Sequence, residues 1–182
     1  MQNKLYDLSI VTCSYNAENT IENFIKQIDH ICKNILKIQN FEIIVTDDFS
    51  KDNTVNILKK LITNNYPIKL ITLSKNCGNH YAMKQSIKNS SGKNIFEIDS
   101  DLEISTSYLE IFWESYKNEK KPFLVFGIQQ NRNKKSLINF LSTFYYYFIN
   151  FFSDIKIPIN QLQIRIYCST IKDTIIKNFE EG

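Results

Sequence analysis

Apolar residues follow two different patterns along this chain. Short runs in which nearly every residue is apolar are typical of strands buried on both faces, and they occupy residues 8–13, 41–46, 68–73, 94–98 and 123–128. Apolar residues at spacings of three and four are typical of amphipathic helices, and they occupy residues 18–38, 54–62, 78–88, 107–117 and 170–179. Strands that alternate with helices predict an α/β fold, a three-layer α/β/α sandwich around a mainly parallel sheet.

Three polar clusters come directly after predicted strands: Ser14-Tyr15-Asn16, Asp47-Asp48 and Asp99-Ser100-Asp101. Parallel strands bring their carboxyl ends to one edge of the sheet, and ligands of such folds bind there. The sequence therefore predicts one site built from all three clusters. Asn76 and Gly78 follow a further strand and precede a helix, whose first N–H groups favour phosphate.

The residue types in these clusters suggest a role for each. Asp99 and Asp101 can direct two carboxylates at one hard cation, and Mg²⁺ or Mn²⁺ is often held by one or two carboxylates plus substrate phosphates. An acidic group of Asp47 or Asp48 can accept a base N–H or a ribose hydroxyl, and Tyr15 can stack on a base. The structural alternatives are that the acids cap the following helix and that the tyrosine packs in the core.

Charge and hydropathy narrow the possible partners. The net charge of +3 is too small to indicate a nucleic-acid binder. The segment from Lys121 to Arg165 contains six cationic residues and one anionic residue, Asp154. It also contains an aromatic stretch over residues 137–152. This tract fits an anionic ligand or a membrane surface, and a solvated face beside a core helix is the alternative. No apolar run reaches the roughly 20 residues that span a bilayer, and no signal peptide begins the chain, so we expect a cytoplasmic protein, peripheral on the inner face of the membrane.

Several linked motifs resemble the family-2 inverting glycosyltransferases of GT-A (Rossmann-like) fold, over roughly residues 1–130. They are Ser9–Asn16, Ile44–Thr54, Asn76-Cys77-Gly78, Ala82, Gly92 and Asp99–Glu103. A later group of segments resembles the polyprenyl-phosphate branch, which includes dolichol-phosphate mannose synthase and bacterial relatives. That group comprises Phe126–Arg132, the aromatic stretch, Ile157-Pro158 and Gln163–Ile166.

The resemblance implies a role for each matching residue. The nucleotide sugar would contact Cys13, Tyr15, Asp47, Asp48, Asn76, Gly78, Asp99, Ser100 and Arg132. Mg²⁺ or Mn²⁺ would be held by Asp99 and Asp101, with Glu103 as a third ligand. Asp101, Gln163 and Arg165 would form the catalytic group, with Arg132 and Arg165 against phosphates of donor or acceptor. The sequence departs from the family at Cys13, where a proline is usual, and at Phe49, where the turn usually has a small residue.

The implied reaction is metal-dependent transfer, with inversion, from a UDP- or GDP-linked sugar to a polyprenyl (lipid) phosphate. Many relatives carry an aspartate, proposed as general base, where this chain has Gln163. A lipid phosphate is already anionic at neutral pH and needs no base, whereas a sugar hydroxyl normally does. Extension of a surface polysaccharide or glycolipid and an inactive nucleotide-binding remnant both stay open. A phosphoacceptor signalling domain and a haloacid-dehalogenase-like phosphatase are disfavoured, because both need their acids after other strands.

We expect one glycosyltransferase domain over residues 1–182, with a nucleotide-binding half (1–103) and an acceptor-side half (104–182) that contains the aromatic helix 137–152. Members of the family usually continue further, often into transmembrane helices. A short homologue and a C-terminally truncated chain both stay open, as does a homo-oligomer.

Overall fold

A computed structural model describes residues 6–118, 124–128 and 161–178. By their contacts the residues form two compact units, one of residues 1–125 with 164–182 and a smaller one of residues 126–163. Arg132 and the predicted aromatic helix 137–152 lie outside the described residues. No helix in the described ranges is both long enough and apolar enough to cross a membrane.

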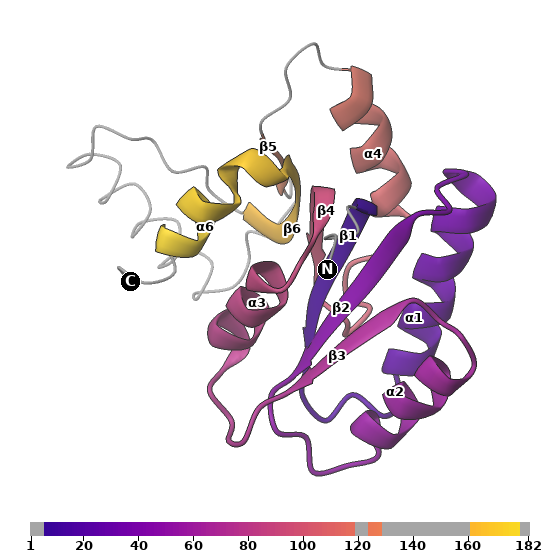
Figure 1. Cartoon of the computed structure of the whole chain (residues 1–182), viewed down its shortest axis with the longest axis vertical. Coiled ribbons are helices and arrows are strands. Elements are labelled where there is room, and N and C mark those ends of the chain that lie inside the picture. Colours follow the sequence, from indigo (N-terminus) through magenta and orange to yellow (C-terminus); the bar gives the residue numbers. More distant parts are fainter. Residues whose placement is uncertain (1–5, 119–123, 129–160, 179–182) are drawn as a thin grey trace, which may run out of the picture. The chain divides into compact units, whose positions relative to one another are not determined.

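The larger unit contains the predicted parallel sheet (Figure 1). Its parallel strands are β1 (Tyr6–Ser14), β2 (Phe41–Asp47), β3 (Ile68–Thr72) and β4 (Gly92–Ile98), in the spatial order β3-β2-β1-β4. The connecting helices are α1 (Ile21–His30), α2 (Thr54–Thr63) and α3 (Asn79–Lys88). A π-helical turn, Ile31–Ile35, continues α1, so the single helix predicted over residues 18–38 changes its hydrogen-bonding pattern near its end. The α/β fold predicted from the sequence is confirmed.

The second half of the chain adds one strand that the sequence analysis missed. After α4 (Tyr108–Asn118) and β5 (Leu124–Ile128), strand β6 (Gln161–Cys168) pairs antiparallel with β4, from Asn94 opposite Cys168 to Ile98 opposite Ile164. The full strand order is β3-β2-β1-β4-β6-β5. A 3₁₀ turn, Ser169–Ile171, then leads into α6 (Lys172–Asn178). Polar and apolar residues alternate through Gln163-Ile164-Arg165-Ile166, the period of two that is typical of a strand.

Helices cover both faces of the sheet, with α3 on one side and α1 and α2 on the other in Figure 1. Side chains of successive strand residues point to opposite faces, so each strand supplies two layers of the core. On the face of α3 and α6, Val11, Ile44 and Ile95 pack with residues of both helices, including Ile87 and Ile175. On the other face, the α1 side chains Phe24, Ile25 and Ile28 are fully buried. The Phe96 ring there meets the Phe112 ring of α4 edge to face, with centroids 6.0 Å apart.

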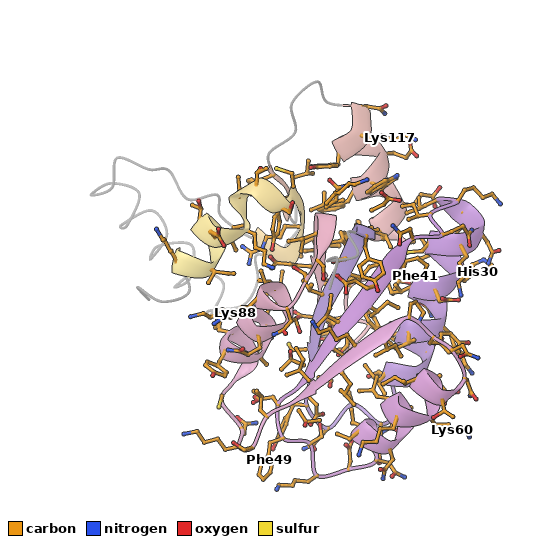
Figure 2. The ribbon with its side chains drawn as sticks, in the orientation of Figure 1. His30, Phe41, Phe49, Lys60, Lys88 and Lys117 are labelled. Atoms are coloured by element: carbon orange, nitrogen blue, oxygen red, sulfur yellow. The ribbon has the colours of Figure 1, made fainter. Side chains whose placement is uncertain are left out.

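A buried polar cluster fixes the register of β1, β2 and β4. The Ser9 hydroxyl donates to Glu42 Oε1 (2.6 Å) and accepts the N–H of Gly92 (2.7 Å). Glu42 Oε1 also accepts the N–H of Ser91 (2.6 Å). A Cβ at Gly92 would stand 2.6 Å from the Ser9 nitrogen, so only glycine lets β4 approach this closely. Phe41 begins β2 and Phe49 lies in the loop that follows it in Figure 2, and the candidate site lies on the side of that loop.

Candidate functional site

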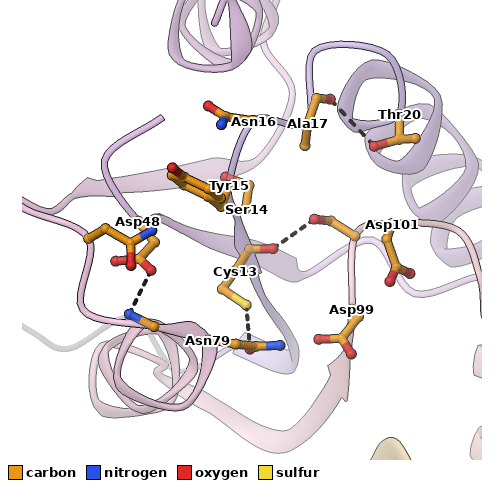
Figure 3. Close-up of a pocket in the computed structure, with 13 residues that line it drawn as sticks. Cys13, Ser14, Tyr15, Asn16, Ala17, Thr20, Asp48, Asn79, Asp99 and Asp101 are labelled. Atoms are coloured by element: carbon orange, nitrogen blue, oxygen red, sulfur yellow. Dashed lines mark hydrogen bonds between the residues drawn. The ribbon is translucent and has the colours of Figure 1, made fainter. Parts of the chain in front are cut away.

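A cavity of about 430 Å³ opens at the carboxyl ends of β1, β2 and β4 (Figure 3). Residues from all three predicted polar clusters line it, together with the start of α3. The lining residues are Cys13, Ser14, Tyr15, Asn16, Ala17, Thr20, Asp48, Asn76, Gly78, Asn79, Asp99, Ser100 and Asp101. The structure therefore brings together most of the residues that the sequence analysis selected. Asp48 lies on one side of Cys13, and Asp99 and Asp101 lie on the other.

Asp48 joins the loop after β2 to the start of α3. Its Oδ1 accepts the N–H of Cys77 (2.7 Å) and its Oδ2 accepts the N–H of Gly78 (2.8 Å). Gly78 has φ 87° and ψ 157°, a backbone conformation that is almost restricted to glycine. The Tyr15 side chain, 52% exposed, lies at the same pocket, where its ring is accessible to a ligand.

Asp47 is used differently, although it is the neighbour of Asp48. It is buried and does not line the cavity. Its carboxylate accepts the N–H (2.9 Å) and the hydroxyl (2.5 Å) of Ser50, and weakly the hydroxyl of Ser14 (3.4 Å). Phe49 between them adopts a left-handed conformation, φ 66°, with Lys51 Nζ 3.2 Å from the centre of its ring. Asp47 thus holds the turn, and its contact with substrate stays a prediction.

Asp99 and Asp101 form the acidic side of the cavity. Asp99 Oδ1 is buried without a hydrogen-bond partner. Burial, followed by the charge of Asp101, raises the pKa of Asp99, and a hydrogen bond from the Asn79 side chain opposes this. An unpartnered buried carboxylate oxygen beside a second carboxylate is unfavourable by itself and fits a cation.

Few side chains of the cavity could bind a cation directly. Asp101 is exposed, and its Oδ1 accepts the N–H of Glu103 (3.0 Å). Glu103 is exposed and is not among the lining residues. Within the described ranges, no three His, Cys, Asp or Glu side chains gather at one point as a metal site. The arrangement therefore fits a Mg²⁺ or Mn²⁺ ion that takes its remaining ligands from phosphate and water. Glu103 as a third ligand stays a prediction.

Cys13 connects three elements of the site. The Ser100 hydroxyl donates to the Cys13 carbonyl (2.7 Å), and Cys13 Sγ donates to Asn79 Oδ1 (2.8 Å). Burial, and then the charges of Asp99 and Asp48, raise the pKa of Cys13 to about 12, so the thiol is protonated at neutral pH. The sequence analysis did not select Asn79, because nothing in its sequence neighbourhood reveals that it faces Cys13 and Asp99.

Arg165 lies on β6, opposite Glu97 of β4. Glu97 precedes Asp99 by two residues in the chain. The Nε of Arg165 donates to Glu97 Oε2 (2.6 Å), and the Tyr167 hydroxyl donates to Glu97 Oε1. Burial raises the pKa of Glu97, and the charge of Arg165 opposes this. The sequence analysis missed Glu97, although a carboxylate within an otherwise apolar strand signals a buried partner. The predicted contact of Arg165 with phosphate stays a prediction, as does the role of Gln163, which is exposed on β6 in the smaller unit.

The model of the family described as glycosyl transferase family 2 matches residues 9–174. The chain belongs to glycosyltransferase family 2. The predicted family is thereby confirmed, whereas the polyprenyl-phosphate branch within it stays a prediction.

One relative of this chain is the poly-β-1,6-N-acetyl-D-glucosamine synthase of Staphylococcus aureus (strain MSSA476). The two chains are 29% identical over 143 residues, which make up 79% of this chain and 33% of the synthase. Two further bacterial relatives, 29% and 28% identical, are covered over 50% and 49% of their length. The chain therefore spans between a third and a half of the length of these relatives.

Two solved structures have the same fold. A mannosyltransferase of Pyrobaculum calidifontis in complex with GDP-Man and Mn²⁺ superimposes with a TM-score of 0.62 at 14% identity, over 94% of this chain and 47% of that one. The second is glucosyl-3-phosphoglycerate synthase of Mycobacterium tuberculosis in complex with Mn²⁺, UDP and glucosyl-3-phosphoglycerate. It superimposes with a TM-score of 0.61 at 17% identity, over 91% of this chain and 58% of that one. At such low identity the likeness is one of fold alone, and it confirms the predicted GT-A architecture.

Proposed function

We propose that this domain transfers a sugar from a nucleoside diphosphate sugar, with the help of a divalent cation and with inversion at the sugar, to a lipid phosphate. One observation carries the first part of the proposal. The unpartnered Oδ1 of Asp99 lies beside Asp101 in the same cavity as Tyr15 and Asp48. A cation-binding end and a nucleoside-binding end are thus combined within one pocket.

Each end of the cavity binds a different part of the donor. The Tyr15 ring stacks on the base, and Asp48, fixed by two backbone N–H groups, accepts from a base N–H or a ribose hydroxyl. Asp99 and Asp101 hold Mg²⁺ or Mn²⁺. When bound, the cation stabilises negative charge on the departing diphosphate. The mannosyltransferase with GDP-Man and Mn²⁺ and the synthase with UDP and Mn²⁺ support this assignment, and both UDP and GDP are candidates.

The acceptor is the second part of the proposal. Gln163 cannot remove a proton, and a phosphate acceptor at neutral pH does not require that it should. The tract from Lys121 to Arg165 combines cations with aromatic residues and suits the anionic inner surface of a membrane. A sugar hydroxyl is the second candidate acceptor, favoured by the similarity to the poly-β-1,6-N-acetyl-D-glucosamine synthase.

Calorimetry with UDP and with GDP, each with and without Mn²⁺, tests the donor site. We expect one of the two nucleotides to bind more tightly when Mn²⁺ is present. Asp99→Asn should remove this dependence, whereas Asp7→Asn, which changes an exposed carboxylate paired with Lys93, should not. A chain that binds neither nucleotide with metal is the inactive remnant, and the proposal is then wrong.

Turnover with purified acceptors tests the second part. Polyprenyl phosphate in detergent and an oligosaccharide are offered separately with the nucleotide sugar that binds. We expect product with polyprenyl phosphate alone. Turnover with the oligosaccharide only would replace the lipid phosphate by a sugar hydroxyl and leave the donor site unchanged.

A further inference from the structure

We propose that Asn16 is a positioning residue for the nucleoside end of the cavity, because it ties the loop that carries Tyr15 to the loop that carries Asp48. The inference rests on the proposed function, since it assumes that a base stacks on the Tyr15 ring. Asn16 is given no contact with the base. Its role is to hold the backbone from which the ring extends.

Asn16 makes two hydrogen bonds to the loop after β2. Its backbone N–H donates to Ser50 Oγ (2.9 Å), and its side-chain Oδ1 accepts the N–H of Lys51 (2.8 Å). Ser50 is held in turn by the buried carboxylate of Asp47, which accepts its N–H (2.9 Å) and its hydroxyl (2.5 Å). A continuous series of contacts therefore leads from the end of β2 to the residue that follows Tyr15.

The backbone of both loops is adapted to these bonds. Asn16 has φ 49° and Phe49 has φ 66°, so both lie in the left-handed region that residues other than glycine rarely adopt. Asparagine is enriched there several-fold, whereas a bulky residue such as phenylalanine is an outlier. Backbone strain of this kind persists only where surrounding contacts determine the conformation. Here those contacts join Asn16 and Asp47 to the turn at Ser50 and Lys51.

The loop after β1 is anchored on both sides of this point by other contacts. The Ser14 carbonyl accepts the N–H of Asp48 (2.8 Å), and the N–H of Ala17 donates to the hydroxyl of the buried Thr54 (2.8 Å). Loss of the Asn16 bonds would therefore release only the two residues between these anchors, and the fold would remain.

The consequence falls on Tyr15, the other residue between the anchors. Its side chain is 52% exposed, so the direction of its backbone largely decides where the ring lies. In the view of Figure 3, the ring lies between the side chains of Asn16 and Asp48. A side chain that is ordered before the ligand arrives avoids the entropic cost of ordering it on binding. We expect the Asn16 contacts to be worth about 3- to 10-fold in nucleotide affinity.

The test measures nucleotide affinity by calorimetry. UDP and GDP, each with Mn²⁺, are titrated into the 182-residue chain, and the nucleotide that binds is the probe. Asn16→Gly removes the acceptor of the Lys51 N–H and keeps a residue for which φ 49° is unstrained. We expect it to weaken binding about 3- to 10-fold. The melting temperature should change little, because the lost bond is exposed to water.

Asn65→Gly is the matched control. Asn65 is likewise exposed and left-handed, with φ 64°, and it lies between α2 and β3, at the end of the strands away from the cavity. The exchange adds the same backbone freedom to the chain and should leave nucleotide affinity unchanged.

Two further variants test how Asn16 acts. Asn16→Asp restores an acceptor oxygen and should recover part of the affinity at high ionic strength, which screens the added charge. Tyr15→Ala removes the ring itself. If Asn16 acts through the ring, Asn16→Gly should have little further effect in the Tyr15→Ala chain, since residues that act through one another are not additive. A merely structural role would lower the affinity by the same factor in both backgrounds.

Each result supports or overturns the positioning role. Normal nucleotide affinity in folded Asn16→Gly overturns it and leaves the proposed function intact. An equal loss in Asn65→Gly, no recovery in Asn16→Asp, or an undiminished effect in the Tyr15→Ala chain overturns it as well. If the unchanged chain binds neither nucleotide with Mn²⁺, then the proposed function and this inference fail together.

Discussion

Gly78 offers a sharp test of how the pocket is built, because its substitution adds one methyl group in open space. A Cβ there would meet no atom within 4 Å, so crowding does not oppose alanine. What opposes it is the backbone, with φ 87° and ψ 157°. Such a conformation costs a residue other than glycine about 1–3 kcal/mol. Alanine also lowers the conformational entropy of the unfolded chain, and this offsets about 0.4–1 kcal/mol of the loss in stability.

The net effect of Gly78→Ala is therefore a loss of about 1–2 kcal/mol of stability, from the difference of these two terms. For a chain of this length it corresponds to a fall in melting temperature of roughly 2–8 °C. If the backbone relaxes instead, the N–H of residue 78 turns away from Asp48 Oδ2, and a wall of the nucleotide pocket moves. Nucleotide binding should then weaken along with stability.

Thermal unfolding followed by circular dichroism measures the first effect, and calorimetry with UDP and GDP measures the second. Lys75→Ala, at an exposed position of the same loop, is the control and should change stability by less than about 0.5 kcal/mol. A Gly78→Ala chain with the melting temperature and nucleotide affinity of the unchanged chain would refute the argument, because the left-handed backbone would then not be required.

Three other predictions follow from contacts described above. Asp101→Asn should abolish turnover, weaken metal-dependent nucleotide binding and leave the melting temperature unchanged, since Asp101 is exposed; an unfolded or fully active variant would contradict this. Tyr167→Phe removes one of the donors to buried Glu97 and should lower the free energy of unfolding in urea by about 2 kcal/mol; an unchanged urea midpoint would contradict it. Gly92→Ala forces a Cβ to within 2.6 Å of Ser9 and should cost about 1–3 kcal/mol in the same assay; a variant as stable as the unchanged chain would show that β4 shifts freely and would contradict this.

The sequence predicted most of the residues that line the cavity, for a simple physical reason. Parallel strands end at a common edge, so an acidic cluster after a buried strand reaches the site whatever the details of its loop. Tyr15, Asp48, Asp99 and Asp101 all line the cavity on this ground alone. The same reasoning could not separate Asp47 from Asp48. The alternation of side chains along β2 does so, and the Asp47 carboxylate serves the turn at Ser50.

Other features depend on which elements become neighbours in space. Strand β6 was missed because its partner, β4, lies more than sixty residues earlier in the chain, and a proline shortly before β6 indicated only a break. Glu97 and Arg165 could be matched only after that pairing was known. Asn79 becomes meaningful only when the start of α3 is placed between Cys13 and Asp99. Local patterns predict elements, whereas these contacts depend on pairings between distant segments.

The antiparallel pairing of β4 with β6 has a consequence for how the protein is made. When a ribosome has released residues 1–118, the four parallel strands are complete, yet β4 still presents an unpaired edge. Such an edge is a template for pairing with another chain. It stays open until residues 161–168 emerge, which at about 5–20 residues per second takes several seconds. Nascent chains halted between these points should therefore aggregate or recruit chaperones, and chains released after residue 168 should not.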